Sequence, residues 1–313
     1  MLRVVDLKVR YKAVNTVTLP PYTGSTFRGA FGHAFRSAVC VTRLHDCESC
    51  SLRDSCLYLR AFETKPGPID LSHLGITSEA PRPFVIAPGM DTPRQLTPDQ
   101  TLTIRMSLFG WLTEYVSFVV YALQRVGENG IGRNRSRMIL ENVTDQAGNA
   151  IYDAENSRSD AVTTETLGFE TNGDEKDGNI IVEWLTPLRI SIKGRPLRNI
   201  DFSSVFRSLM RRSAAMFTYH ESAPLPYDPN ELVRLSDEAK TVLDNTRWYD
   251  WKRYSSRQDK DVPLGGVLGV VEYRNVRSEL RPWLNIAERI HVGKGCTVGL
   301  GKPAVRRRAT LDA

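Results

Sequence analysis

At 313 residues the chain is long enough for two ordinary domains, and its 41% hydrophobic and 25% charged content is typical of a globular protein. No apolar run approaches the ~20 residues that a membrane helix needs, and the charged N-terminus does not resemble a signal peptide, so we expect a cytoplasmic protein without a membrane partner. The net charge of +6 is compatible with nucleic acid as a partner, although many basic proteins bind none.

The first half of the chain shows the hydrophobic periodicities of a mixed α+β domain. Alternating and helical spacing of apolar residues predicts strands over residues 2–12, 101–107 and 137–143, and helices over 24–38 and 111–126. With insertions, we interpret residues 1–145 as the order strand-helix-strand-strand-helix-strand, of whose four strands three have the ranges given above. This is the order of a ferredoxin-like domain.

Four of the five cysteines lie close together after the first predicted helix, at Cys40, Cys47, Cys50 and Cys56. A Cys-x2-Cys pair flanked by two more cysteines suits tetrahedral zinc, and disulfides are the weaker explanation in an intracellular chain. The spacing is not that of a standard zinc finger, so free thiols are the alternative. Because four thiolates would fill the coordination sphere, we expect a structural zinc in a cysteine-rich insert over 40–56, and no catalytic metal.

The charge is distributed unevenly. Residues 146–182 carry eight acidic residues against Arg158 and Lys176, a net charge of −6, so the rest of the chain carries +12. This stretch is also poor in bulky apolar residues and rich in Gly, Asn, Ser and Thr. We therefore expect residues 146–179 to form an acidic linker or a hairpin insertion between two basic domains.

The second half repeats the organisation of the first. The same periodicities predict strands over 180–193, 248–253, 267–273 and 303–308, and helices over 202–219 and 278–289. Residues 180–313 thus have the same order of elements. The predicted fold class is α+β, with two tandem ferredoxin-like (RRM-like) domains.

A glycine-rich segment, His291-Val-Gly-Lys-Gly-Cys-Thr-Val-Gly-Leu-Gly-Lys302, follows the last predicted helix. It fails the Walker pattern, because the required first glycine is Cys296 and Pro303 follows the Gly-Lys pair. It also fails the dinucleotide fingerprint, because Val298 stands at the third glycine position. Glycine lets backbone N–H groups approach a phosphate and lysine adds charge, so an RNA backbone is the favoured ligand, with a glycine-rich hairpin as the alternative.

These motifs together resemble the CRISPR-associated endoribonucleases that process repeat RNA, a family of the RAMP superfamily. The resemblance extends over nearly the whole chain and rests on the segments at 19–32, 56–58, 130–135, 251–258, 265–273 and 291–301. It implies two RRM-like domains with the glycine loop of the second lying against RNA. It also implies metal-independent cleavage of pre-crRNA by the 2′-hydroxyl, giving crRNA with 2′,3′-cyclic phosphate and 5′-hydroxyl ends.

Such chemistry needs a base, an acid and a cation for the phosphate, and histidine suits either proton role. His33 lies just after Arg28 on the first predicted helix, where relatives often place a catalytic histidine, so we expect it to be catalytic. His45 ranks second, because it could serve catalysis or act as a zinc ligand. His291 belongs to the C-terminal motif of the family, where it would support the glycine loop or touch RNA.

Arginines and lysines beside aromatic residues and glycines are the expected RNA contacts, since arginine holds phosphate bidentately or stacks on a base. The predicted RNA-binding set is Arg28, Arg253, Arg257, His291, Gly293, Lys294, Gly295, Gly299, Gly301 and Lys302.

Two other classes of protein remain open. A non-catalytic RAMP subunit that binds crRNA in a CRISPR effector complex would have the same fold, charge and glycine loop. A zinc-containing nucleic-acid-binding protein unrelated to CRISPR fits the two-domain glycine pattern less well. The expected partners are CRISPR repeat RNA or crRNA, with other effector-complex subunits as further candidates.

Overall fold

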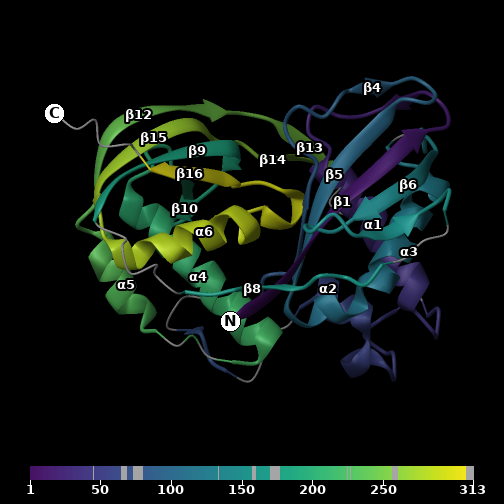
Figure 1. The fold of residues 1–313 in the computed structure, drawn as a ribbon, viewed down its shortest axis with the longest axis horizontal. Helices are drawn as coiled ribbons and strands as arrows, with labels where there is room; N and C mark the ends of the chain where they lie inside the picture. The colour runs from purple at the N-terminus through teal and green to yellow at the C-terminus, as the bar shows by residue number, and fades with distance from the viewer. Residues whose placement is uncertain are drawn as a thin grey trace. The chain divides into compact units, whose positions relative to one another are not determined.

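A computed structural model describes residues 1–44, 46–64, 69–72, 80–132, 134–156, 160–169, 177–223, 225, 227–255 and 260–307, with only the backbone described at 252–255, 260–263 and 307 (Figure 1). The chain divides into two compact units. The N-terminal unit comprises residues 2–166 and 215–223, and the C-terminal unit comprises residue 1, 167–214 and 224–313. None of the described helices combines the length and apolarity that crossing a membrane requires.

The N-terminal unit is built on an antiparallel sheet in the order β3-β5-β1-β6-β7, with β8 also paired to β1. Its strands are β1 (Leu2–Ala13), β2 (Val17–Thr18), β3 (Phe84–Ala87), β4 (Gln95–Leu96), β5 (Thr101–Phe109), β6 (Met138–Thr144), β7 (Ala150–Asp153) and β8 (Glu165–Leu167). Its helices are α1 (Gly24–Val39), α2 (Leu57–Phe62) and α3 (Val116–Asn129). Taken alone, the chain order β1-α1-β3-β5-α3-β6 with the sheet order β3-β5-β1-β6 is the ferredoxin-like fold.

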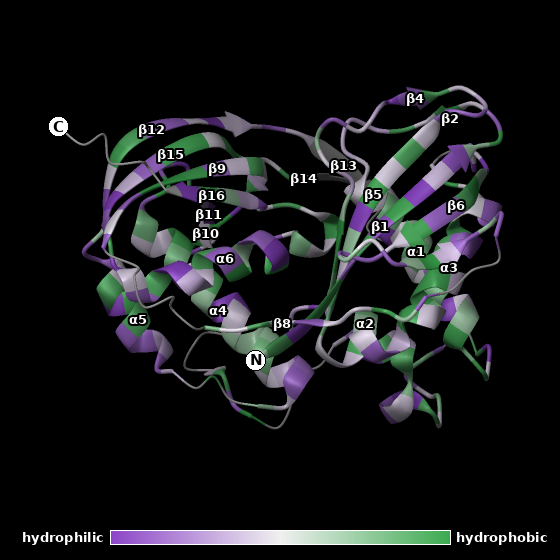
Figure 2. Cartoon of the chain, in the orientation of Figure 1, coloured by the Kyte–Doolittle hydropathy of each residue, from purple (hydrophilic) through white to green (hydrophobic). Residues whose placement is uncertain are grey.

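Strict alternation along the central strands gives this sheet one buried and one solvent face. In β1 the side chains of Leu7, Val9 and Tyr11 are buried, whereas Lys8 and Arg10 between them are exposed. The same alternation of hydrophobic and hydrophilic residues is visible along β1 and β5 in Figure 2. The buried face packs with the apolar sides of α1 and α3 into one core.

The cysteine insert, residues 40–56, leads from α1 into the short helix α2. Phe62 of α2 fixes that helix to the core, because its ring centroid lies 5.7 Å from that of Phe31 in α1 and 5.0 Å from that of Phe84 in β3. Such aromatic pairs contribute about 0.5–1.5 kcal/mol each beyond their buried area. The aromatic cluster therefore determines where the exposed residues of α2 lie.

The C-terminal unit repeats the fold with a four-stranded antiparallel sheet in the order β12-β15-β9-β16. Its strands are β9 (Gly178–Leu188), β10 (Ser191–Ile192), β11 (Arg195–Pro196), β12 (Lys240–Tyr249), β13 (Lys252–Ser255), β14 (Lys260–Pro263), β15 (Gly266–Val276) and β16 (Pro303–Arg307). Its helices are α4 (Phe202–Glu221), of which 202–214 belong to this unit, α5 (Pro229–Ser236) and α6 (Arg281–Ile290). The order β9-α4-β12-β15-α6-β16 confirms the second ferredoxin-like domain.

The structure differs from the sequence-based expectations in three places. The strand predicted over 248–253 is wrong, because β12 ends at Tyr249 and β13 begins at Lys252. The exposed edge strand β12 lacks the apolar alternation that marks a strand. The segment 146–179 contains β7, hydrogen-bonded to β6, and β8, paired with β1, and the division between the two units falls after residue 166. Residues 110–115 form a 3-10 turn, η3 (Gly110–Tyr115), ahead of α3.

Candidate active site and nucleic-acid interface

His33 lies on the exposed side of α1. The opposite side of this helix buries Phe27, Phe31 and Phe35 in the core, which orients His33 toward solvent. His33 makes no hydrogen bond or ion pair with any residue that the structure describes. One turn earlier, a Cβ added at Gly29 would meet no atom within 4 Å, so the helix surface beside His33 is open. An accessible imidazole beside an uncovered stretch of helix is what a general base for a large substrate requires.

Two arginines of α1 lie over aromatic rings of α2. The Arg28 guanidinium is 5.3 Å from the centroid of the Phe62 ring, and that of Arg36 is 5.7 Å from the Tyr58 ring. Arg36 also donates a 2.8 Å hydrogen bond to the backbone oxygen of Leu44 in the cysteine insert. Arg36 therefore holds the insert against α1, whereas Arg28 is half-buried near the start of the helix, five residues before His33.

The four cysteines of the insert line one cavity of about 190 Å³, and all four are half-buried. The Thr42 hydroxyl lies 3.6 Å from Cys50 Sγ and 3.9 Å from Cys40 Sγ, and Leu44 and Leu59 add apolar walls. No group of three or more His, Cys, Asp or Glu side chains among the described residues is arranged to hold a metal ion. The prediction of a zinc site at Cys40, Cys47, Cys50 and Cys56 is therefore not supported, because the thiols surround an apolar-walled cavity without converging on one point. His45 lies outside the described residues.

The glycine loop between α6 and β16 is a compact turn of its own. Gly293, Gly295, Gly299 and Gly301 all have positive φ, between 70° and 86°. Its backbone amides donate to acceptors within the protein at Lys294, Val298, Gly299, Leu300, Gly301 and Lys302. A Cβ at Gly301 would lie 1.8 Å from the carbonyl oxygen of Val292, and one at Gly293 would lie 2.5 Å from that of Arg189. Close backbone packing is therefore sufficient reason for glycine at positions 293 and 301.

His291 holds this loop from inside. Only 2% of the residue is exposed, and its Nδ1–H donates to the backbone oxygen of Leu300 at 3.1 Å. Burial, together with the charge of Lys302, lowers the pKa of His291 to about 3, so the ring is neutral at physiological pH. This histidine supports the loop and has no surface to offer a ligand.

The lysines of the loop reach its surface, since Lys294 is exposed and Lys302 half-buried. Arg253 lies on β13, where the backbone alone is described, and Arg257 lies outside the described residues. The structure thus describes the side chains of Arg28, Lys294 and Lys302 among the cations predicted to bind RNA.

A further basic surface was not singled out from the sequence. On the solvent face of the N-terminal sheet, Lys8 of β1 lies directly opposite Arg105 of β5, and Arg10 and Lys12 follow along β1. Glu141 of β6 pairs with Arg10 at 2.9 Å and with Lys12 at 3.9 Å, which leaves the face positive. Like charges directly opposite each other in a sheet lower the stability of the fold. An anionic ligand such as an RNA phosphate would offset their repulsion, so the paired cations suit such a ligand. The Lys-x-Arg-x-Lys alternation at 8–12 was the available signal.

Two family models match the chain. Residues 2–166, more than half of the chain, match the model AF_1859_N, described as an N-terminal domain. Residues 182–303 match the model of the CRISPR-associated endoribonuclease Cas6. The resemblance to CRISPR-associated repeat-processing endoribonucleases is thereby confirmed.

Individual relatives agree with these matches. The chain is 26% identical over 285 residues to an uncharacterized protein of Archaeoglobus fulgidus, covering 90% of this chain and 91% of the relative. Its fold is similar to that of a product complex of Cas6 (TTHB231) from Thermus thermophilus, with a TM-score of 0.59, 18% identity, and coverage of 98% of this chain and 100% of the other.

The fold is also similar to that of a partial Cas6-RT-Cas1–Cas2 complex, with a TM-score of 0.56, 13% identity, and coverage of 99% of this chain and 47% of the other. At these identities the solved structures establish the fold, two tandem ferredoxin-like domains. The chain belongs to the family defined by the AF_1859_N N-terminal domain, and its second half carries the domain of the CRISPR-associated endoribonuclease Cas6.

Proposed function

We propose that the protein is a metal-independent endoribonuclease that cleaves CRISPR repeat RNA, with His33 as a catalytic residue. The observation that carries the proposal is the exposed imidazole of His33, which has no hydrogen-bond partner among the described residues, beside the open helix surface at Gly29. RNA supplies its own nucleophile, so the enzyme needs only proton transfer and charge stabilisation.

The proposed reaction is an in-line transesterification. His33 removes the proton from a 2′-hydroxyl, and the 2′-oxygen attacks the adjacent phosphorus. The bond from phosphorus to the 5′-oxygen breaks, and an acid or water returns a proton to that oxygen. The products are a 2′,3′-cyclic phosphate and a 5′-hydroxyl. The guanidinium of Arg28 would stabilise the developing negative charge of the phosphate.

Basic residues of both units would hold the RNA. The solvent face of β1 and β5 offers Lys8, Arg10 and Arg105 to phosphates, and Lys294 and Lys302 do so on the glycine loop. Arg253 and Arg257 remain proposed contacts on the strength of the family resemblance. An enzyme acting on CRISPR transcripts would work in the cytoplasm, where other CRISPR proteins are available as partners.

The second candidate is a non-catalytic subunit that binds crRNA. It is favoured by the absence of an acid or base hydrogen-bonded to His33 among the described residues. The two candidates differ in whether the RNA is cut.

The test is an incubation with repeat RNA in excess chelator, beside the same RNA with one 2′-deoxy nucleotide at the scissile position. Cleavage of the first RNA alone, with cyclic phosphate ends, is expected. His33→Ala should lower the rate by about 10²–10⁴-fold. Ser37→Ala, exposed one turn further along α1, should leave the rate unchanged. Full activity of His33→Ala would remove the catalytic assignment, and binding without cleavage would favour the non-catalytic subunit.

A further inference from the structure

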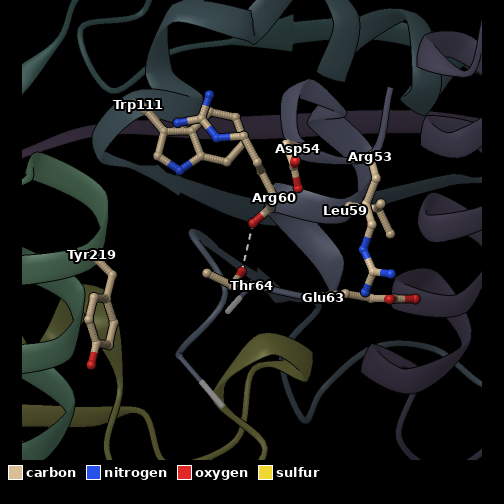
Figure 3. A pocket seen from close by; sticks show the side chains of 8 residues that line it. All are labelled: Arg53, Asp54, Leu59, Arg60, Glu63, Thr64, Trp111 and Tyr219. Atoms are coloured by element: carbon tan, nitrogen blue, oxygen red, sulfur yellow. Dashed lines mark hydrogen bonds between the residues drawn. The ribbon is translucent and has the colours of Figure 1, made fainter. Parts of the chain in front are cut away.

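A pocket in the N-terminal unit combines stacking surfaces with hydrogen-bonding groups. Its volume is about 210 Å³ (Figure 3). It is lined by residues of the cysteine insert, α2, η3 and the last turn of α4, namely Arg53, Asp54, Leu59, Arg60, Glu63, Thr64, Trp111 and Tyr219. Neither the proton transfer proposed for His33 nor the basic sheet face uses these residues.

The Arg60 guanidinium lies over the indole of Trp111, with its central carbon 4.1 Å from the ring centroid (Figure 3). Two hydrogen bonds hold the indole in place. Its Nε1–H donates to His220 Nδ1 at 3.2 Å, and His220 Nε2–H donates to the backbone oxygen of Pro81 at 2.6 Å. Trp111 is buried and Arg60 is exposed. A planar, cationic surface is thus presented to solvent on a rigid support.

Polar groups surround this stacked pair. The Thr64 hydroxyl donates to the backbone oxygen of Arg60 at 2.7 Å, which fixes the end of α2 (Figure 3). Arg53 contributes further donors, and the carboxylates of Asp54 and Glu63 are exposed acceptors. Two arginines and two carboxylates give the pocket no net charge. A phosphate would gain little from such a balance, whereas the edge of a base carries both donors and acceptors.

We propose that this pocket takes one unpaired base of the bound RNA, stacked on the exposed face of Arg60. The inference rests on the proposed RNA-binding function and adds a base-reading site to it. The volume of about 210 Å³ lies below the ~300–1,000 Å³ of pockets for drug-sized ligands, and it suits a single planar ring. The cysteine insert contributes Arg53 and Asp54, so it builds one wall of the site.

The test is a binding titration with repeat RNA made uncleavable by a 2′-deoxy nucleotide, in intact form and with single abasic positions along the repeat. One abasic position should raise the Kd of the wild-type protein about tenfold. Arg60→Ala should raise the Kd for intact RNA by a similar factor, and combining the two changes should add nothing further. Arg60→Lys, which keeps the charge without the planar group, should behave like Arg60→Ala.

Arg125→Ala removes a half-buried arginine of α3 that lies outside the pocket and pairs with Glu128, and it serves as the charge control, with little expected effect on RNA binding. Unchanged thermal unfolding of the Arg60 variants verifies their fold. The proposal is overturned if Arg60→Ala binds intact RNA like the wild type. It is also overturned if, at every abasic position, the increase in Kd for the combined changes equals the product of the two separate increases, because the two changes then act independently.

Two further outcomes separate this proposal from the function on which it rests. Coupled losses on an RNA that the wild-type protein binds but never cuts would support the base pocket while refuting the endoribonuclease. Cleavage by a wild-type protein that shows no abasic effect would do the reverse. Tight binding of free nucleoside monophosphates without any abasic effect would show a nucleotide site and overturn the proposal.

Discussion

Substitution of Gly301 tests whether the glycine loop is required by the fold itself. The Cβ of Gly301→Ala would lie 1.8 Å from the carbonyl oxygen of Val292, so the backbone must move by more than 1 Å to restore an ordinary contact. Two hydrogen bonds hold it in place, from Val292 N to Gly301 O at 2.9 Å and from Gly301 N to Pro187 O at 3.0 Å. The residue also has a φ of +70°.

The expected cost follows from these three features. Positive φ costs alanine about 1–2 kcal/mol, and two weakened backbone hydrogen bonds add about 1 kcal/mol each. We therefore expect Gly301→Ala to lower the free energy of unfolding by about 3–4 kcal/mol. Gly194 is the matched control, because its φ is +80° but a Cβ there would meet no atom within 4 Å. Gly194→Ala should cost only about 1–2 kcal/mol.

The assay is urea unfolding followed by tryptophan fluorescence, with both variants compared at the same pH and salt. A difference between the two alanine variants of about 2 kcal/mol is expected. If both variants lose the same free energy of unfolding, close contact with Val292 is not what requires glycine at position 301. Contact with a ligand would then be the reason for this glycine.

Three further outcomes follow from the structure. The His291 ring takes up a proton near pH 6.5 in the unfolded chain but only near pH 3 in the folded protein, so the free energy of unfolding should fall by up to ~1.4 kcal/mol per pH unit below about pH 6.5. In urea titrations between pH 6.5 and 5, His291→Gln should flatten this slope. Lys8→Glu places opposite charges across β1 and β5, so it should raise the free energy of unfolding by about 0.2–1 kcal/mol. The same variant should weaken RNA binding and reduce the salt dependence of that binding by one phosphate contact, and weaker binding with unchanged salt dependence would contradict the basic-face assignment. Ellman's reagent should modify the four half-buried insert thiols faster than Cys296, because Cys296 is 3% exposed and burial raises the pKa of its thiol. If the four insert thiols are instead protected until a chelator is added, the zinc hypothesis is restored.

Much of the fold follows from local patterns. The alternation in β1 and the helical spacing in α1 match their observed bounds to within two residues, because each element buries one face against a core and its sequence records that face. The edge strand β12 was not predicted, because few of its side chains are buried and its sequence therefore shows no alternation of apolar residues. The short strand β3 escaped because four residues are too few to show a period.

The candidate site divides in the same way. His33 could be singled out from its helix and from the family resemblance, and the structure added its exposure. The pocket could not be found from the sequence, because Arg60, Trp111 and Tyr219 are far apart in the chain and only the packing of α2, η3 and α4 brings them together.

Sequence patterns were sufficient to predict the two ferredoxin-like domains, the basic character of the chain and its family, because these depend on short-range periodicity and contiguous motifs. The contacts of individual site residues could be learned only from the three-dimensional structure. The structure showed that six backbone amides of the glycine-rich loop donate to acceptors within the protein, and that the cysteines surround a cavity without forming a metal-binding group among the described residues. The physical reason is that hydrogen bonding and close packing depend on which atoms meet in space, and spacing along the chain does not report this.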